Sequence, residues 1–408
     1  MKLYLSGPPT NRLHAEIQIT GSKSESNRSL LLQALYPNIG IENLSNSDDA
    51  KVMQKGLKIE KGIVDIHHAG TAMRFLTGYF SSQKGKEVTL TGSQRMTERP
   101  IKVLVEALRR LGADIEYVMN EGYPPIHIKG KKITQSKVSL PANISSQYIS
   151  SLLLIAPSLE NGLELELVGK ITSVPYIKMT LGLLSQIGVA NSFEGNTIKV
   201  RPRTFVENTK LVVESDWSSA SYFYSIVSLC EIGTEITLSA YKKNSLQGDS
   251  VLAEVYQDFG VETLFHENKV VLKKTMNCQL TATNCELSNA PDIAQTIAVS
   301  CFGLGIGCHL TGLHTLKIKE TDRLEALHTE LSKLGAVISV TDKSLRLSPS
   351  DGAMLKNVTI DTYNDHRMAM AFAPLALKTS LFINDAEVVS KSYPDFWKDL
   401  KRLGLDVK

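Results

Sequence analysis

The hexapeptide Leu108-Arg109-Arg110-Leu111-Gly112-Ala113 ends an amphipathic helix with a glycine, and similar sequences recur along the chain. Glycine suits the position after a helix because a positive φ there carries little penalty for it. Successive copies are 56, 76, 72, 75 and 69 residues apart. A spacing near 70 residues predicts six copies of one structural unit. Their glycines, beginning with the weakest match, are Gly56, Gly112, Gly188, Gly260, Gly335 and Gly404.

The second copy predicts what one unit contains. Its elements, in order, are an apolar helix at 72–80, a strand at 87–91, a charged loop at 92–100, an amphipathic helix at 101–111 and short strands at 113–118 and 126–129. The other copies predict strands at 163–168, 234–239 and 380–383, and hairpins at 197–200, 261–272 and 336–347. Each unit is therefore predicted to be βαβαββ.

The first helix of each unit is almost entirely apolar, as at Leu152–Ala156, Phe223–Cys230 and Ala369–Leu377. A helix that is apolar on all sides is buried on all sides. We therefore predict an α/β protein of two similar domains, with a midpoint at residues 211–216. Each domain would hold three units, with buried inner helices inside outer sheets and outer helices, in the manner of an inside-out α/β barrel.

The composition is that of an ordinary globular protein and limits the function classes. Of the 408 residues, 42% are hydrophobic and 21% charged, and the formal net charge is +3. So small a charge argues against a general affinity for nucleic acid or membranes. The five cysteines have no CxxC spacing and are predicted to be free thiols. No apolar leader and no stretch of about 18 apolar residues is visible, so we expect a cytoplasmic protein.

Polar residues recur at two places in each unit. One is the start of the inner helix, with Ser22-Lys23-Ser24, Gly70-Thr71, Ser145-Ser146-Gln147, Asp216-Trp217-Ser218, Pro291-Asp292 and Asp365-His366-Arg367. The other is the loop before the outer helix, with Arg95 to Pro100, Ser173 to Tyr176, Lys319 to Arg323 and Lys391 to Asp395. Both places should lie at one end of each domain. Helix N-termini and converging cations favour anions, so we expect a ligand with several anionic groups.

Other signatures are weak. The chain has no GxxxxGK[ST] sequence, so a P-loop is not indicated. Gly303 to Gly307 lacks the dinucleotide-binding spacing, and a role in packing is the better interpretation. The adjacent pairs His67-His68 and Cys308-His309 do not have the spacing of metal ligands, so no metal is expected.

Seven motifs, in order along the chain, resemble the 5-enolpyruvylshikimate-3-phosphate synthase family of enolpyruvyl transferases. They are GSKSESNR (21–28), AGTAMR (69–74), RMTERP (95–100), SSQY (145–148), KETDR (319–323), YNDHRMAM (363–370) and KSYPD (391–395). The resemblance implies domains of residues 21–214 and of residues 1–20 with 215–408, with the active site in the cleft between them. It also implies transfer of the enolpyruvyl group of phosphoenolpyruvate to the 5-hydroxyl of shikimate 3-phosphate, with release of phosphate and without a cofactor or metal.

The resemblance assigns roles to individual residues. It implies three catalytic residues, with Asp292 as the base at the 5-hydroxyl and Lys23 and Glu320 exchanging protons with the enolpyruvyl group. The implied phosphoenolpyruvate ligands are Lys23, Gly70, Arg95, Gln147, Arg323, Arg367 and Lys391. The implied shikimate 3-phosphate ligands are Lys23, Ser24, Arg28, Ser145, Ser146, Gln147, Ser173, Asp292 and Lys319. Arg74 and Arg99 are expected to be structural, and His366 is a secondary candidate.

Some residues depart from the family pattern. His68 stands where Asn is usual, Phe75 where Pro is usual, and Thr315 to Ile318 lack the usual Asn and Trp. These departures concern the geometry near Gly70 and one substrate contact near Thr315. Gly70 would leave room for a phosphonate inhibitor such as glyphosate.

Two alternatives remain open on the sequence. One is the enolpyruvyl transferase that acts on UDP-N-acetylglucosamine, whose family usually has a Cys in its N-terminal half, whereas Cys230 is the first cysteine here. The other is a phosphate-binding or RNA-processing protein on a related repeat fold. Asp292 and Glu320 argue against a simple binder, because carboxylates repel anions. We expect small-molecule substrates, no nucleic acid or membrane partner, and a monomer.

Overall fold

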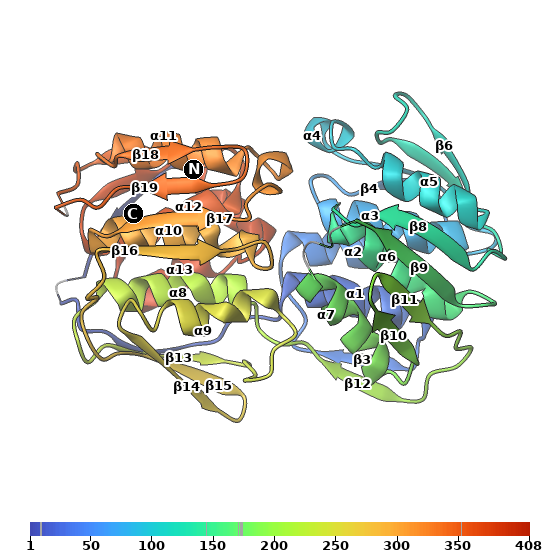
Figure 1. Cartoon of the computed structure of the whole chain (residues 1–408), viewed down its shortest axis with the longest axis horizontal. Helices are drawn as coiled ribbons and strands as arrows, with labels where there is room; N and C mark the ends of the chain where they lie inside the picture. The colour runs from blue at the N-terminus through green and yellow to red at the C-terminus, as the bar shows by residue number, and fades with distance from the viewer. Residues whose placement is uncertain (9, 144, 170, 172–173, 352) are drawn as a thin grey trace. The chain divides into compact units, whose positions relative to one another are not determined.

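Six β-sheets organise the part of the chain that the computed structural model describes, and they fall into two groups (Figure 1). The structure describes all residues except 9, 144, 170, 172–173 and 352. The chain divides into two compact units, here called unit 1 (Met1–Thr20 and Glu214–Lys408) and unit 2 (Gly21–Val213).

Five of the sheets share one strand order, which is a parallel pair extended by an antiparallel hairpin or its equivalent. Those of unit 2 are β4 (Lys61–Asp65)-β5 (Glu87–Thr91)-β7 (Ile126–Lys129)-β6 (Asp114–Tyr117) and β8 (Lys137–Pro141)-β9 (Leu163–Val168)-β11 (Thr197–Val200)-β10 (Asn191–Glu194). Those of unit 1 are β2 (His14–Ile17)-β13 (Glu235–Ser239)-β15 (Lys269–Lys274)-β14 (Val261–His266), β16 (Ala282–Glu286)-β17 (Gly307–Thr311)-β19 (Leu345–Leu347)-β18 (Ile338–Val340) and β20 (Val358–Ile360)-β21 (Leu381–Ile383)-β1 (Leu3–Ser6)-β22 (Asp406–Val407). The predicted repeat and the α/β fold class are confirmed.

The first copy of the repeat is shorter than predicted. Its sheet holds only β3 (Ile39–Glu42) and β12 (Thr209–Val212), paired in parallel. Gly56 was expected to follow a helix, but it lies inside α2 (Asp48–Leu57), where its close neighbour is Leu76. That prediction was wrong because β4 begins at Lys61, which leaves no room for a hairpin after α2. Gly56 therefore allows close packing against Leu76 and does not end a helix.

Most residues of the inner helices are buried, as the apolar runs in their sequences predict. They are α1 (Lys23–Leu35), α3 (Gly70–Ser82) and α6 (Ser146–Ile155) in unit 2, and α8 (Trp217–Leu229), α10 (Ala294–Leu304) and α12 (His366–Phe372) in unit 1. In α3 every residue except the last is buried. Full burial of one large apolar side chain stabilises the fold by roughly 1.5–3 kcal/mol. Each group of three therefore forms the core of its unit.

The outer helices are amphipathic or short. They are α2, α5 (Lys102–Leu111) and α7 (Val174–Gln186) in unit 2, and α9 (Leu252–Val255), α11 (Arg323–Lys333) and α13 (Phe396–Arg402) in unit 1. The glycine after α5, Gly112, has φ of 105°, which confirms the predicted helix end. No helix among the described residues is long and apolar enough to cross a membrane.

The chain passes between the units at two positions, after Thr20 and after Val213. Strand β2, just before the first position, pairs in parallel with β13, and Ile17 is opposite Leu238. Gly21 then packs so closely that a Cβ atom there would lie 1.8 Å from the carbonyl oxygen of Asn43. Only glycine fits that contact without a shift of the backbone.

Candidate functional site

Unit 1 gathers its polar residues at the ends of three inner helices. The 3₁₀ helix η3 (Pro291–Ile293) leads into α10, and its Asp292 is joined by residues that precede α11 and α12. Ser221 of α8 and Thr296 of α10 are hydrogen-bonded at 3.0 Å, and Arg367 of α12 reaches Ser218 of α8 at 3.2 Å. The three helix starts therefore meet at one end of the unit, as the repeat predicted.

Arg323 lies at the centre of this group and is 2% exposed. Its Nε donates to Asp365 at 2.6 Å, and its two terminal nitrogens donate to Asp292 and Glu320, each at 2.9 Å. Burial alone would lower the pKa of Arg323, but these three carboxylates raise it above its ordinary value. The guanidinium is permanently charged and fixes the positions of all three carboxylates.

Asp292 forms ion pairs with three cations. Besides Arg323, the Nζ of Lys319 lies 3.4 Å from its Oδ1, and a terminal nitrogen of Arg367 lies 3.2 Å from its Oδ2. Burial tends to raise the pKa of Asp292, but Arg367, Lys319 and Arg323 hold it well below its ordinary value. Asp292 is therefore ionised here, and it can accept a proton only when a ligand draws those cations away.

Glu320 is the second carboxylate with cations on both oxygens. Its Oε2 contacts Arg323, and its Oε1 is 3.0 Å from the Nζ of Lys391. Lys391 ends the 3₁₀ helix η6 (Ala386–Lys391) and is itself buried. Two cations and one carboxylate thus converge where an anionic ligand could displace the carboxylate.

Helix caps hold this arrangement in place. Asp322 caps α11 by accepting from the backbone N–H groups of Leu324 and Glu325 at 3.1 and 3.2 Å. Asp365 caps α12 by accepting from the N–H of Arg367 at 2.9 Å. These caps place Arg323 and Arg367 in the first turn of a helix, where the helix dipole also favours an anion.

His366 and Asp249 lie next to this group. The His366 ring is buried, and its Nδ1 is 3.6 Å from Asp365. Asp249 belongs to the 3₁₀ helix η2 (Gly248–Val251) and accepts a hydrogen bond from the hydroxyl of Ser218. Sequence reasoning missed Asp249, because it lies in none of the recognised motifs.

Unit 2 gathers hydroxyl and amide groups at the equivalent place. Gln147 at the start of α6 donates to the hydroxyl of Thr71 at the start of α3, at 3.1 Å. Ser145 caps α6 by accepting from the N–H of Gln147 at 3.4 Å, and Ser146 follows it. Ser173, predicted to belong to this group, lies outside the described residues.

Lys23 and Arg28 both belong to α1 but differ in their surroundings. The Nζ of Lys23 lies 3.5 Å from Asp49, a buried residue of α2. Arg28 is 2% exposed and donates to Thr180, Ser150, and the carbonyl oxygens of Ser24 and Tyr176. Burial lowers the pKa of Arg28 to about 10. Arg28 thus joins α1, α6 and α7, with most of its donors already in use.

The two arginines of RMTERP differ in their surroundings. Arg95, in the short helix α4 (Gln94–Thr97), has a side chain that is 51% exposed and pairs with Glu98 at 3.3 Å. Arg99, expected to be structural, lies against Gly70, where a Cβ atom would be 2.6 Å from its guanidinium nitrogen. Arg74 donates to the carbonyl oxygens of Gly70 and Pro100, each at 3.2 Å, which is a structural contact. Arg99 is therefore better placed than Arg95 to act beside Gly70.

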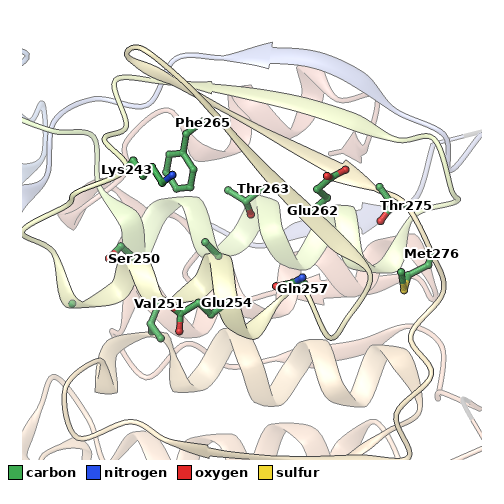
Figure 2. A pocket seen from close by; sticks show the side chains of 12 residues that line it. Lys243, Ser250, Val251, Glu254, Gln257, Glu262, Thr263, Phe265, Thr275 and Met276 are labelled. Atoms are coloured by element: carbon green, nitrogen blue, oxygen red, sulfur yellow. The ribbon is translucent and has the colours of Figure 1, made fainter.

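A groove of about 830 Å³ lies elsewhere on unit 1. Figure 2 shows Ser250, Val251 and Glu254 facing Thr263 and Phe265 across it. The residues that line it include no member of the group around Arg323. The described residues contain no cluster of three or more His, Cys, Asp or Glu able to hold a metal ion.

Comparison with known proteins identifies a family. The sequence matches the family model for EPSP synthase (3-phosphoshikimate 1-carboxyvinyltransferase) over residues 38–400. A 3-phosphoshikimate 1-carboxyvinyltransferase of Bacteroides fragilis is 46% identical, with 100% of this chain and 99% of that protein aligned. One from Haemophilus influenzae is 35% identical over 97% of this chain and 98% of its own length.

Solved structures show the same fold. An EPSP synthase from Acinetobacter baumannii superposes with a TM-score of 0.82 at 21% identity, over the full length of both chains. The enolpyruvyl transferase NikO from Streptomyces tendae superposes with a TM-score of 0.74 at 14% identity, over 100% of this chain and 98% of its own. At such identities the likeness concerns the fold alone.

Proposed function

Because the chain belongs to the EPSP synthase (3-phosphoshikimate 1-carboxyvinyltransferase) family, we propose that it transfers the enolpyruvyl group of phosphoenolpyruvate to the 5-hydroxyl of shikimate 3-phosphate. The structural observation that carries this proposal is the buried Arg323, which holds Asp292 and Glu320 among further cations. A proton-transferring pair of carboxylates beside anion-binding groups is what the reaction requires.

Phosphoenolpyruvate binding falls to cations from both units in this proposal. Arg323, Arg367 and Lys391 of unit 1 contact carboxylates that an incoming carboxylate or phosphate can replace. Unit 2 adds Lys23, Gly70 and Gln147, and we assign to Arg99 the role first expected of Arg95. Arginine suits this role because it can bind a planar carboxylate through two parallel hydrogen bonds.

Shikimate 3-phosphate binding falls mainly to unit 2. Ser24, Ser145 and Ser146 offer hydroxyls at the starts of α1 and α6, where free backbone N–H groups favour a phosphate. Ser173 is assigned to the same set, and Lys319 and Asp292 of unit 1 complete it. Arg28 contributes indirectly, because its hydrogen bonds fix the positions of α1, α6 and α7, of which α1 and α6 carry Ser24 and Ser146.

The chemistry has two steps. Glu320 takes up a proton once the ligand anions have displaced it from Arg323 and Lys391. In the addition, Glu320 gives this proton to the methylene carbon, the 5-oxygen bonds to C2, and Asp292 accepts the hydroxyl proton. In the elimination, Glu320 takes a methyl proton back, the bond between C2 and the phosphate oxygen breaks, and Lys23 supplies a proton to the departing phosphate. No protein nucleophile is needed. Ligand binding prepares both carboxylates, because ligand anions take over Arg323, Arg367 and Lys391 as partners.

Release of phosphate from the two substrates tests this function. We expect phosphate only when phosphoenolpyruvate and shikimate 3-phosphate are both present, and none with UDP-N-acetylglucosamine as acceptor. Glu320→Gln should lower kcat by about 10²–10⁴-fold with a smaller change in KM, since it removes a proton-transfer group. Glu325→Gln, an exposed carboxylate on the adjoining helix, is the matched control and should leave kcat unchanged.

Two outcomes would contradict the proposal. Failure to release phosphate from the pair of substrates would remove the assigned reaction. A Glu320→Gln variant with normal kcat and a raised KM would instead assign Glu320 to binding alone. We also propose that the chain acts as a monomer, because one chain supplies both sets of residues. A cytoplasmic location remains our prediction from the sequence. Sedimentation of the active protein would test its oligomeric state.

A further inference from the structure

The polar group of unit 1 already pairs its cations with carboxylates before any ligand arrives. Four cations, Lys319, Arg323, Arg367 and Lys391, form ion pairs with the carboxylates of Asp292, Glu320 and Asp365. Asp249 joins the group through Ser218 and supplies the fourth carboxylate. A ligand with two or three negative charges therefore creates an excess of negative charge in a buried place, where such an excess is costly.

Asp249 differs from the other three carboxylates in its partners. It is 5% exposed, and one of its oxygens accepts from the Ser218 hydroxyl. Among the described residues its Oδ1 has no hydrogen-bond partner, and no cation forms an ion pair with it. Each of the other carboxylates contacts Arg323 directly. Asp249 is thus the carboxylate that loses least when it takes up a proton.

The surroundings of Asp249 favour its neutral form. Burial raises the pKa of Asp249 to about 7, and the charge of Asp292 adds to that effect. Asp216, at the start of α8, also raises it, while Arg367 and the Ser218 hydrogen bond lower it. These are the charged groups that face Asp249 from η3, α8 and α12.

We propose that Asp249 takes up a proton when an anionic substrate binds at Arg367, and so keeps the charge of the site in balance. This inference rests on the proposed function, because phosphoenolpyruvate is the anion assigned to Arg367. Asp249 acts as a positioning residue. Its neutral form removes a negative charge that competes with the substrate for Arg367, while Ser218 keeps contact with both side chains.

The sign of the effect follows from linkage. Below a pH of about 7 Asp249 already carries its proton, and binding does not depend on pH through this residue. Above it, each binding event must draw one proton from solution, which raises KM by up to about tenfold per pH unit. Other groups, including the phosphate of the substrate, titrate identically in a variant that lacks the carboxyl group. The ratio of KM values between the wild-type protein and such a variant therefore isolates Asp249.

The experiment measures KM for phosphoenolpyruvate from pH 6 to pH 9 at saturating shikimate 3-phosphate. For wild type over Asp249→Asn, we expect a KM ratio that is constant below about pH 7 and rises by up to about tenfold per unit above it. Asp249→Ser provides a second carboxyl-free variant if the first does not fold. A ratio that stays constant from pH 6 to pH 9 would overturn the proposal.

Two controls separate charge from structure. Ser218→Ala removes the bridge but keeps the carboxyl group, so its KM should rise with the wild-type slope but from a higher pH, because the Ser218 hydrogen bond no longer lowers the pKa of Asp249. Asp258→Asn changes an exposed carboxylate of the segment after α9 and should leave the KM profile unchanged. An inactive wild-type protein would refute the proposed reaction, whereas an active protein with a constant ratio would refute only the role of Asp249.

Discussion

The polar ends of unit 1 and unit 2 are built on similar helices but differ in electrostatics. In unit 1 the buried Arg323 holds three carboxylates, and Lys319, Arg367 and Lys391 complete a network of ion pairs. In unit 2 the buried Arg28 contacts two hydroxyls and two carbonyl oxygens. The pKa of Arg323 is raised and that of Arg28 is lowered, since charged partners outweigh burial only in unit 1. The shared topology fixes where the polar groups gather, and the residues decide which chemistry they support.

This difference suggests separate roles for the two units in the proposed reaction. In the proposed function, the carboxylates that gain and lose protons lie in unit 1, where cations hold them until a ligand arrives. The hydroxyls and helix N-termini of unit 2 are assigned to the binding of a phosphate. Proton transfer is therefore assigned mainly to unit 1, and recognition of the phosphorylated acceptor mainly to unit 2, with Lys23 as the exception.

The largest expected effect is the loss of stability when one of the two buried arginines, Arg323 or Arg28, is replaced. Arg323→Met leaves three carboxylates without their shared cation and should lower the stability of unit 1 by about 3–5 kcal/mol. Arg28→Met removes hydrogen bonds to neutral groups and should cost about 1–3 kcal/mol in unit 2. Both tryptophans, Trp217 and Trp397, belong to unit 1. Urea unfolding followed by tryptophan fluorescence should therefore detect the first change, and circular dichroism both.

Equal losses in the two variants would show that the ion-pair network adds nothing beyond ordinary hydrogen bonding. Arg346→Met, which changes an exposed residue of β19 in unit 1, is the matched control for the loss of one arginine. Its fluorescence transition should coincide with that of the wild-type protein.

A smaller effect is expected at Gly70 of unit 2, which lies against the charged side chain of Arg99. Gly70→Ala places a methyl group 2.6 Å from the Arg99 guanidinium, so that side chain must move. We expect KM for phosphoenolpyruvate to rise by about 10–100-fold, which corresponds to the loss of one charged hydrogen bond, with a smaller change in kcat. Gly40→Ala is the control, because the nearest atom to its Cβ would be 4.0 Å away. An unchanged KM would show that Arg99 does not bind this substrate.

The fold was largely predictable from the sequence, because each repeat has its own apolar helix, amphipathic helix and glycine. The inner helices are apolar on all sides, and Gly112 ends α5 as expected. The error at Gly56 arose because glycine serves two purposes, ending a helix or allowing a close contact. The sequence does not distinguish these purposes when the side chain that it meets, here Leu76, is distant in the chain.

The positions of candidate residues were predictable where motifs recur, whereas the choice between Arg95 and Arg99 depends on a loop and stays a prediction. KETDR and YNDHR place Arg323 and Arg367 at helix starts, and those starts meet. RMTERP offers two arginines around the four-residue helix α4, which is too short to set which one faces Gly70. Asp249 was not predicted, because its role depends on its burial beside Ser218, and these two residues are 31 positions apart in the sequence.

The smallest expected effect is at Arg95, and it sharpens the comparison between two arginines four residues apart. Arg95→Ala removes an exposed ion pair with Glu98, a contact worth about 0.2–1 kcal/mol at most. KM and kcat should therefore stay within about twofold of the wild-type values. Arg99→Ala should raise KM for phosphoenolpyruvate at least about tenfold, since a charged hydrogen bond to the substrate contributes about 1.5–3 kcal/mol. If steady-state assays instead show the larger rise in KM for Arg95→Ala, phosphoenolpyruvate binding belongs to Arg95, as the resemblance of the sequence motif implied.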